Sequence, residues 1–102
     1  MIYCCHPKHA DSLTIRDLGK VQRAAWPARS CWFNIGLELN IDPDTLETIT
    51  RDCDRTDDCF RVMLTTWLKK AQPKATLEAL ADALRSPTVD CAHTAEQVMS
   101  LK

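Results

Sequence analysis

The sequence predicts an all-α fold, and three observations support this prediction. Apolar residues recur at three- and four-residue spacing around Trp32 and again around Trp67, which places them on one face of a helix. The chain has only two glycines, and β-branched residues nowhere alternate with polar ones over the length of a strand. Two amphipathic helices in a chain of 102 residues have to pack against each other, because a domain of this size has a single core.

The first helix is expected over residues 14–26. Ser12 or Thr14 can cap its N-terminus, and Asp17 stands three residues after Thr14, where it can complete a variant of the capping box. The inner face is formed by apolar residues at helical spacing: Ile15, Leu18, Val21 and Ala25. Pro27 is expected to break the chain there, because proline cannot continue a helix.

The second helix is expected to start at about Ala28 and carries the first of the two tryptophans. Its inner stripe consists of Trp32, Ile35, Gly36 and Leu39. Asp42 and Pro43 then mark a helix start, with aspartate as the N-cap and proline in the first helical position. The third helix is therefore expected over about 43–53, and its inward residues are Leu46 and Ile49.

The fourth helix is expected over about 58–71, after a polar connector over 54–58 that ends in N-cap candidates. Lys69 and Lys70 lie at its C-terminal end, where positive charge interacts favourably with the helix dipole, and Pro73 stops it. Its residues that face the core are expected to be Cys59, Val62, Met63, Trp67 and Leu68.

Two further helices complete the chain. Thr76 can cap a fifth helix that ends at about Arg85, and its inward residues are Leu77, Leu80 and Leu84. A break over 86–88 follows, after which Val89 is expected to close the core. Asp90 is expected to cap the sixth helix, whose inward residues are Ala95, Val98 and Leu101.

The loops between the expected helices are short, which favours antiparallel packing of consecutive helices. One domain is expected over residues 12–102, preceded by a flexible lead-in over residues 1–11 that shows no hydrophobic period. The positions expected to form the structural core are Leu18, Val21, Trp32, Ile35, Leu39, Leu46, Ile49, Val62, Trp67, Leu80, Leu84 and Val98.

Charge is unevenly distributed along the chain, whose formal net charge is −1. Residues 1–36 carry five basic and two acidic residues, and residues 37–66 carry three basic and eight acidic residues. Residues 67–102 carry five basic and four acidic residues. The near-zero net charge argues against general nucleic-acid binding, which usually needs a basic face. A domain with a basic end and an acidic middle can attract copies of itself or of related domains head to tail.

Two kinds of charged surface are candidates for partner binding. The acidic patch on the third helix and its flanking loops consists of Asp42, Asp44, Glu47, Asp52, Asp54, Asp57 and Asp58. The basic patches are a stripe on the first helix, Arg16, Lys20 and Arg23, and a group near the end of the fourth, Lys69, Lys70 and Lys74. We expect the acidic patch of one copy to contact a basic patch of its neighbour. Such a contact joins two different faces, so it does not have to produce a closed ring and can generate helical oligomers.

Six cysteines allow two interpretations, a disulfide framework or reduced thiols. No run of 7–15 apolar residues follows a basic N-terminal region, so no signal peptide is expected. Four cysteines lie within or at the ends of predicted helices, where a small apolar side chain packs well: Cys31, Cys53, Cys59 and Cys91. We favour reduced, intracellular thiols. No stretch approaches the ~20 apolar residues of a membrane span, so direct membrane insertion is not expected.

No catalytic site, metal site or cofactor is expected. The only cluster of metal-ligand residue types is Cys4, Cys5, His6 and His9. Adjacent cysteines reach one zinc ion only with strain, and structural sites usually space their cysteines by two to four residues. A thiol enzyme needs a histidine close to an activated cysteine, but His93 is two residues from Cys91, which on a helix puts them on different faces.

The order of apolar residues resembles a death domain of the death-fold superfamily over about residues 12–101. The resemblance is carried by Trp32, Ile35, Gly36, Leu39, Ile41, Leu46 and Ile49, then Cys59, Met63, Leu64, Trp67 and Leu68, then Thr76, Leu80, Ala83, Leu84, Val89, Ala95 and Val98. The related caspase-recruitment and death-effector domains lack the pairing of one tryptophan in the second helix with another at the end of the fourth. Two positions depart from the pattern: Leu77 stands where many relatives have an aromatic residue, and Thr94 stands where leucine is common.

The resemblance implies a six-helix antiparallel bundle in Greek-key order, without catalytic activity, that associates homotypically and recruits signalling proteins. We expect a cytoplasmic adaptor that binds other death-domain proteins or a second copy of itself, in apoptotic or innate-immune signalling. Three alternatives stay open: a small secreted bundle stapled by disulfides, a helix-turn-helix nucleic-acid binder, and a death fold that serves only as a spacer or autoinhibitory lid. The helix-turn-helix alternative is disfavoured because its candidate reading helix, the third, is acidic and would be repelled by phosphate.

Overall fold

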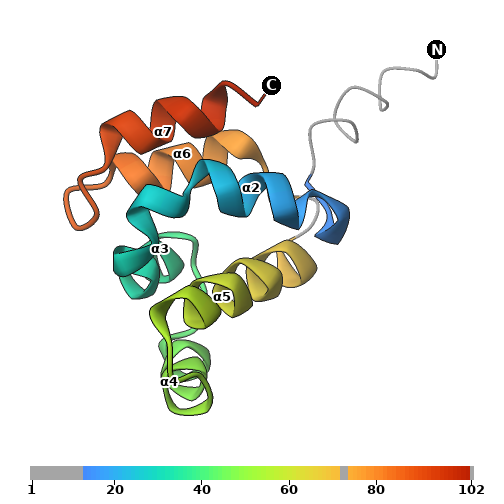
Figure 1. The fold of residues 1–102 in the computed structure, drawn as a ribbon, viewed down its shortest axis with the longest axis vertical. Helices are drawn as coiled ribbons and strands as arrows, with labels where there is room; N and C mark the ends of the chain where they lie inside the picture. Colours follow the sequence, from blue (N-terminus) through green and yellow to red (C-terminus); the bar gives the residue numbers. More distant parts are fainter. Residues whose placement is uncertain (1–12, 72–73, 102) are drawn as a thin grey trace.

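The computed structural model describes residues 13–71 and 74–101, and this part of the chain forms six α-helices and two 3-10 segments (Figure 1). In chain order the elements are η2 (Ile15–Asp17), α2 (Leu18–Ala24), η3 (Trp26–Cys31), α3 (Trp32–Glu38), α4 (Pro43–Asp52), α5 (Thr56–Lys70), α6 (Leu77–Arg85) and α7 (Ala92–Met99). The predicted all-α class and six-helix bundle are confirmed. α5 contacts α2, α3, α4 and both 3-10 segments, whereas α6 and α7 pack against each other as an antiparallel pair (Figure 1).

The first helix begins with the predicted capping box but not with an α-helical turn. The Thr14 hydroxyl accepts a hydrogen bond from Arg16 N at 3.3 Å, and the Asp17 carboxylate accepts one from Thr14 N at 2.9 Å. The turn itself is the 3-10 segment η2, which advances about 120° per residue instead of about 100°. Ile15 is therefore rotated away from the core and is 43% exposed, contrary to its predicted inward orientation.

The α-helix is interrupted next to Pro27 as predicted, but it already ends at Ala24, and the next segment is not α-helical. Pro27 lies in the first turn of the 3-10 segment η3, where a missing backbone N–H leaves no hydrogen bond unmade. α3 consequently begins at Trp32 rather than at about Ala28. A Cβ added at Gly36 would lie 2.6 Å from Leu46 Cδ2, so this glycine allows α3 and α4 to approach closely.

Two predicted N-caps are present in the structure. The Asp42 carboxylate accepts a hydrogen bond from Asp44 N at 3.2 Å, and Pro43 occupies the first turn of α4. The Thr76 hydroxyl accepts a hydrogen bond from Ala79 N at 3.1 Å at the start of α6. Both helices therefore begin where their local sequence predicts.

The starts of α5 and α7 differ from the prediction. α5 begins at Thr56, so its N-cap is Arg55 and not an aspartate at the end of the connector. Asp90 does not cap α7, because its φ of 53° places it in the left-handed region, where its N–H turns back to donate to Ser86 O at 2.6 Å. Cys91 takes the N-cap position without a side-chain hydrogen bond to the helix.

The prediction that Val62 lies in the core is wrong, since its side chain is 38% exposed. The buried residues of α5 recur in pairs four residues apart: Cys59, Phe60, Met63, Leu64, Trp67 and Leu68. These pairs cover one half of the helix surface, and Val62 lies on the other half. Phe60, which the predicted inner face of this helix did not include, is completely buried.

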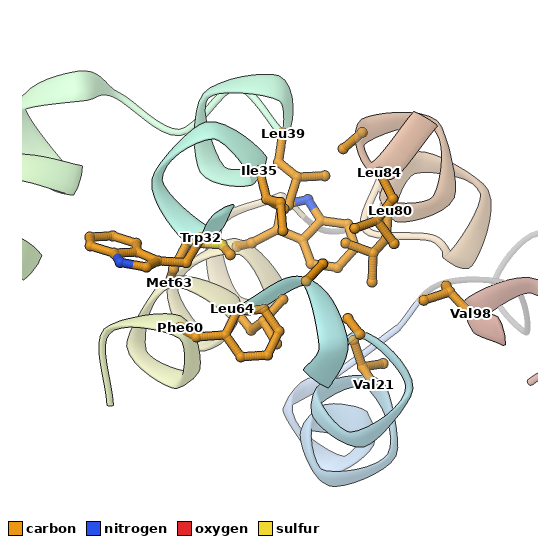
Figure 2. Packing of buried hydrophobic residues seen from close by; sticks show 14 of the residues in the cluster. Val21, Trp32, Ile35, Leu39, Phe60, Met63, Leu64, Leu80, Leu84 and Val98 are labelled. Carbon is orange, nitrogen blue, oxygen red and sulfur yellow. The ribbon is translucent and has the colours of Figure 1, made fainter. Parts of the chain in front are cut away.

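The core is assembled from the inner faces of all six α-helices, and Figure 2 shows part of it. The expected core residues that are buried are Val21, Trp32, Ile35, Leu39, Leu46, Ile49, Trp67, Leu80, Leu84 and Val98. Leu18 is half-buried and packs against the edge of this cluster. Val89 is buried, as expected for a residue that closes the core.

Candidate interaction surface

The acidic residues predicted to bind a partner lie in two groups and not in one patch. Asp42, Asp44 and Glu47 lie at the start of α4, whereas Asp52, Asp54, Asp57 and Asp58 surround the connection between α4 and α5. A rise of about 1.5 Å per residue puts the Cα atoms of Asp44 and Asp52 about 12 Å apart along α4. We call the second group, at the N-terminal end of α5, the acidic end (Figure 1).

One member of the acidic end is tied to the rest of the domain. Arg29 Nε donates to Asp57 Oδ1 at 3.0 Å, and the two side chains form an ion pair. The Arg29 guanidinium also lies over the Trp26 ring at 4.6 Å from its centroid and donates to Trp26 O at 3.0 Å. Trp26 in turn packs edge-on against Phe60, with ring centroids 6.1 Å apart. Asp57 therefore helps to hold η3 against α5, which leaves Asp52, Asp54 and Asp58 as the members best placed to contact a partner.

The structure brings the two predicted basic patches towards one another at the other end of α5. η2 contacts α5, and Leu13 N donates to Ala75 O at 2.6 Å just beyond the end of that helix. The exposed basic residues gathered there, which we call the basic end, are Arg16 of η2 and Lys69, Lys70 and Lys74. Lys20 and Arg23 lie farther along α2, and Lys20 forms an ion pair with Asp17 at 3.4 Å.

α5 separates the acidic end from the basic end. The Cα atoms of Asp57 and Lys70 are 13 residues apart on this helix, which at about 1.5 Å per residue is about 20 Å. Acidic residues at the N-terminus of a helix and basic residues at its C-terminus also stabilise the helix through its dipole, so α5 itself accounts for part of the pattern. The dipole of α5 does not account for the whole separation of charge between the two ends, because four of the charged residues lie outside this helix: Asp52, Asp54, Arg16 and Lys74.

A groove of about 690 Å³ lies between the α3–α4 loop and the C-terminal end of α5. The apolar part of its lining comes from Leu39, Ile41, Trp67, Ala71 and Ala79. Glu38 and Asp42 contribute acidic groups from the α3–α4 side, and Lys70 and Lys74 contribute basic groups from the side of α5. Asp42 therefore shares a groove with two lysines, although its sequence position predicted that it would belong to one patch with Asp52.

Two thiols in the described part of the chain, those of Cys59 and Cys91, are poorly suited to nucleophilic chemistry. Burial raises the pKa of the Cys59 thiol above its ordinary value of 9.0, and nearby Cys53 adds to this effect. Burial likewise raises the pKa of the Cys91 thiol, with contributions from Cys31 and Asp90. A raised pKa leaves less thiolate at neutral pH, and the thiolate is the reactive form.

Metal binding and membrane insertion have no structural support in the described residues. They contain no cluster of three or more histidine, cysteine, aspartate or glutamate side chains arranged to hold a metal ion. The candidate zinc ligands Cys4, Cys5, His6 and His9 lie outside the described residues. None of the described helices has the length and apolar composition needed to cross a membrane.

Sequence reasoning missed Arg29 and the groove. The spacing of Trp26 and Arg29, three residues apart, could have indicated the stacking contact, because one turn brings such side chains together. The groove is lined by residues 38–45 and 67–79, so it depends on how α3, α4, α5 and α6 pack and has no local sequence signal.

A model of the death-domain family matches residues 23–97, which include η3, α3, α4, α5 and α6 in full and most of α7. No curated protein and no solved structure matches the chain significantly. The family match covers well over half of the chain, and the six-helix bundle agrees with it. The chain therefore belongs to the death-domain family, whose members are interaction modules that associate with other death domains in signalling.

Proposed function

We propose that this chain is a cytoplasmic adaptor module that binds a death-domain partner, including a second copy of itself, by contact between the acidic end of one copy and the basic end of the other. The observation that supports this most directly is the separation of opposite charges by about 20 Å along α5. A contact between unlike faces leaves one free face on each side of the assembly, so it can continue into a helical oligomer.

The charged groups suit a contact that orients partners more than one that binds them tightly. Asp52, Asp54 and Asp58 are exposed at one end, and Lys69 and Lys70 are exposed at the other. Exposed ion pairs contribute about 0–1 kcal/mol each, but complementary potentials raise the association rate and select the register. We therefore expect association to weaken as salt rises, because the Debye length falls to about 8 Å at physiological ionic strength.

Recruitment is the proposed consequence of this association. A domain that assembles raises the local concentration of whatever is attached to it, which is how a module without catalytic activity can start a signal. We place this adaptor in signalling of the apoptotic or innate-immune type. Binding to nucleic acid is not proposed, because the third helix of the bundle, α4, carries Asp44, Glu47 and Asp52 and would be repelled by phosphate.

The first test is the solution mass of the reduced chain, measured by light scattering over a range of concentrations at low and moderate salt. Mass should grow with concentration from the monomer value of 11.5 kDa and fall back as salt is added. The double variant Asp52→Lys/Asp54→Lys should stay monomeric at low salt. A matched control, Asp82→Lys/Glu96→Lys, makes the same charge change at exposed positions of α6 and α7 and should associate like the parent chain.

A mixing experiment distinguishes head-to-tail contact from general charge attraction. The Lys69→Ala/Lys70→Ala variant keeps the acidic end, and the Asp52→Ala/Asp54→Ala variant keeps the basic end. Each alone should be monomeric, but their mixture retains one intact pair of faces and should form dimers and nothing larger. Continued association of either variant alone would show that another surface carries the contact.

A further inference from the structure

Opposite charges lie on the two sides of the groove between the α3–α4 loop and the C-terminal end of α5. Glu38 and Asp42 lie on the α3–α4 side, which we call the acidic wall, and Lys70 and Lys74 lie on the side of α5, which we call the basic wall. All four residues are exposed. Within the described residues, no ion pair joins either lysine to either carboxylate. Each wall therefore has charges that an occupant of opposite sign can neutralise.

Local hydrogen bonds hold the acidic wall in place. Ile41 N donates to Gly36 O at 3.0 Å, and Asn40 N donates to Leu37 O at 3.0 Å, which is the pattern of a Schellman motif at the end of α3. Asn40 has a φ of 66°, the left-handed conformation that this motif requires. The Asp42 carboxylate is fixed by its role as the N-cap of α4. A wall that is already ordered loses little conformational entropy when a ligand binds.

Apolar side chains line the groove between the two walls. Leu39 and Trp67 are buried, whereas Ile41, Ala71 and Ala79 are only half-buried, so part of the apolar lining remains open to an occupant. The volume of about 690 Å³ lies within the range of about 300–1,000 Å³ that is typical of ligand pockets. An occupant with apolar side chains between two opposite charges would cover this lining and neutralise both walls.

We propose that the groove binds a linear peptide segment of a partner protein, in which apolar residues are flanked by an acidic residue on one side and a basic residue on the other. The acidic side chain pairs with Lys70 and Lys74, and the basic side chain pairs with Glu38 and Asp42. A segment with charges of one sign would be attracted by one wall and repelled by the other. A single zwitterionic amino acid carries both charges, but its one side chain cannot cover an apolar lining of five residues.

This binding site goes beyond the proposed contact between charged ends, although the two share Lys70 and Lys74. The test therefore uses the Asp52→Ala/Asp54→Ala chain, in which the acidic end is weakened and the groove is unchanged, because neither residue lines the groove. Light scattering of this chain reports on the proposed function alone. Peptide titrations of the same chain report on the groove, so the two proposals can fail independently.

The probes are four pools of five-residue peptides with blocked termini and a fluorescent dye. Their three central positions vary among leucine, isoleucine, valine, phenylalanine and tryptophan, and their outer positions carry glutamate and lysine in the four possible combinations. Fluorescence anisotropy measures binding as the chain is titrated into each pool. The two pools with one glutamate and one lysine should bind at least about fivefold more tightly than the two pools with like charges, a difference of about 1 kcal/mol.

Reversing the basic wall provides a readout that unfolding cannot imitate. Lys70→Glu/Lys74→Glu makes both walls acidic, so this variant should lose its preference for mixed charges and should bind the pool with two lysines most tightly. Lys69→Glu is the matched control, because Lys69 is also exposed at the end of α5 but does not line the groove. The control should keep the preference for the mixed pools.

A second pair of variants tests the acidic wall without removing its hydrogen-bond acceptors. Glu38→Gln/Asp42→Asn should weaken binding of the mixed pools at least about fivefold, about 1 kcal/mol. Asp44→Asn/Glu47→Gln, which makes the same change on α4 outside the groove, should not. Equal binding of all four pools, binding of none of them at peptide concentrations up to about 1 mM, or an unchanged preference when the basic wall is reversed would overturn the proposal.

Discussion

Replacing Gly36 with alanine tests whether the close approach of α3 to α4 is a requirement of the core. The added Cβ would lie 2.6 Å from Leu46 Cδ2, 3.2 Å from Leu46 Cδ1 and 3.3 Å from Met63 Cγ. Carbon atoms in favourable contact are separated by about 3.5–4.0 Å, so the neighbours have to move. Leu46 and Met63 are completely buried, and neither can move without displacing other atoms of a close-packed core.

The magnitude follows from a comparison with the other glycine. Gly19 lies in α2, and a Cβ added there meets no atom within 4 Å. Both substitutions gain about 0.5–1 kcal/mol because alanine favours the helix, but only the one at Gly36 adds an overpacking cost of about 1–3 kcal/mol. The Gly19→Ala chain should therefore be more stable than the Gly36→Ala chain by about 1–3 kcal/mol, a difference from which the helix propensity cancels.

Urea unfolding followed by tryptophan fluorescence measures this difference, and a double-mutant cycle assigns its cause. Leu46→Ala alone should lower the free energy of unfolding by about 2–5 kcal/mol. In the Gly36→Ala background it should cost less, because it removes the methyl groups that the new Cβ meets, and the two changes should couple by about 0.5–3 kcal/mol. Equal gains in stability from both glycine substitutions, or strict additivity in the cycle, would refute the packing argument.

Two further predictions concern the core and the buried thiols. Trp67→Ala should lower the free energy of unfolding by about 3–5 kcal/mol because it leaves a cavity in the core. Val62→Ser should change it by no more than about 0.5 kcal/mol, because the Val62 side chain faces solvent. Urea midpoints measure both effects, and a large loss of stability in Val62→Ser would contradict the exposed position of this residue. Because the pKa values of Cys59 and Cys91 are raised above 9.0, the contribution of these neutral thiols to stability is complete below about pH 9 and is lost as pH rises through their folded pKa values. Thermal unfolding between pH 7 and 10 should show a steeper loss for the parent chain than for Cys59→Ala/Cys91→Ala, and identical pH profiles would count against this reasoning.

The parts of the fold that sequence predicted well are those with a local chemical signal. The cap at Asp42, the capping box at Thr14 and the cap at Thr76 each depend on a side chain that hydrogen-bonds within its own turn. The pairing of helices around Trp32 and Trp67 followed from apolar spacing in the same way. Such signals do not depend on the rest of the chain, so they can be recognised without its structure.

The errors arose where the local signal was ambiguous. Val62 lies in an apolar stretch of the sequence, so periodicity alone did not determine which residues of this helix face the core. The structure shows that Phe60 and Leu64 are buried and that Val62 is not. Pro27 was expected to end the first helix, but α2 ends earlier, at Ala24, and Pro27 lies in the first turn of the 3-10 segment η3. Asp90 was a plausible cap by type, but the left-handed turn that returns the chain to Ser86 uses it differently.

The candidate surface was less predictable than the fold, because sequence places charges on elements but not elements on one another. Of the acidic residues predicted to lie on the third helix and its flanking loops, Asp57 and Asp58 belong instead to the first turn of α5. The length of α4 divides the rest, and Asp42 shares a groove with Lys70 and Lys74. Arg16 and the lysines at and just beyond the C-terminal end of α5 are more than 50 residues apart in the sequence, and they come together only because η2 packs against that end of α5.

The separation of charge along α5 is compatible with the proposed association, because the same residues do not have to destabilise the monomer. At about 20 Å, the two ends are farther apart than the Debye length of about 8–10 Å at physiological salt, so they do not neutralise one another within a copy. In the proposed assembly they are available to a neighbour, and the acidic end of one copy would approach the basic end of the next. The fold itself depends on buried apolar residues that salt does not screen. Raising salt should therefore dissociate the assembly while each domain stays folded, and simultaneous loss of mass and of helical structure would mean that association and folding share the same contacts.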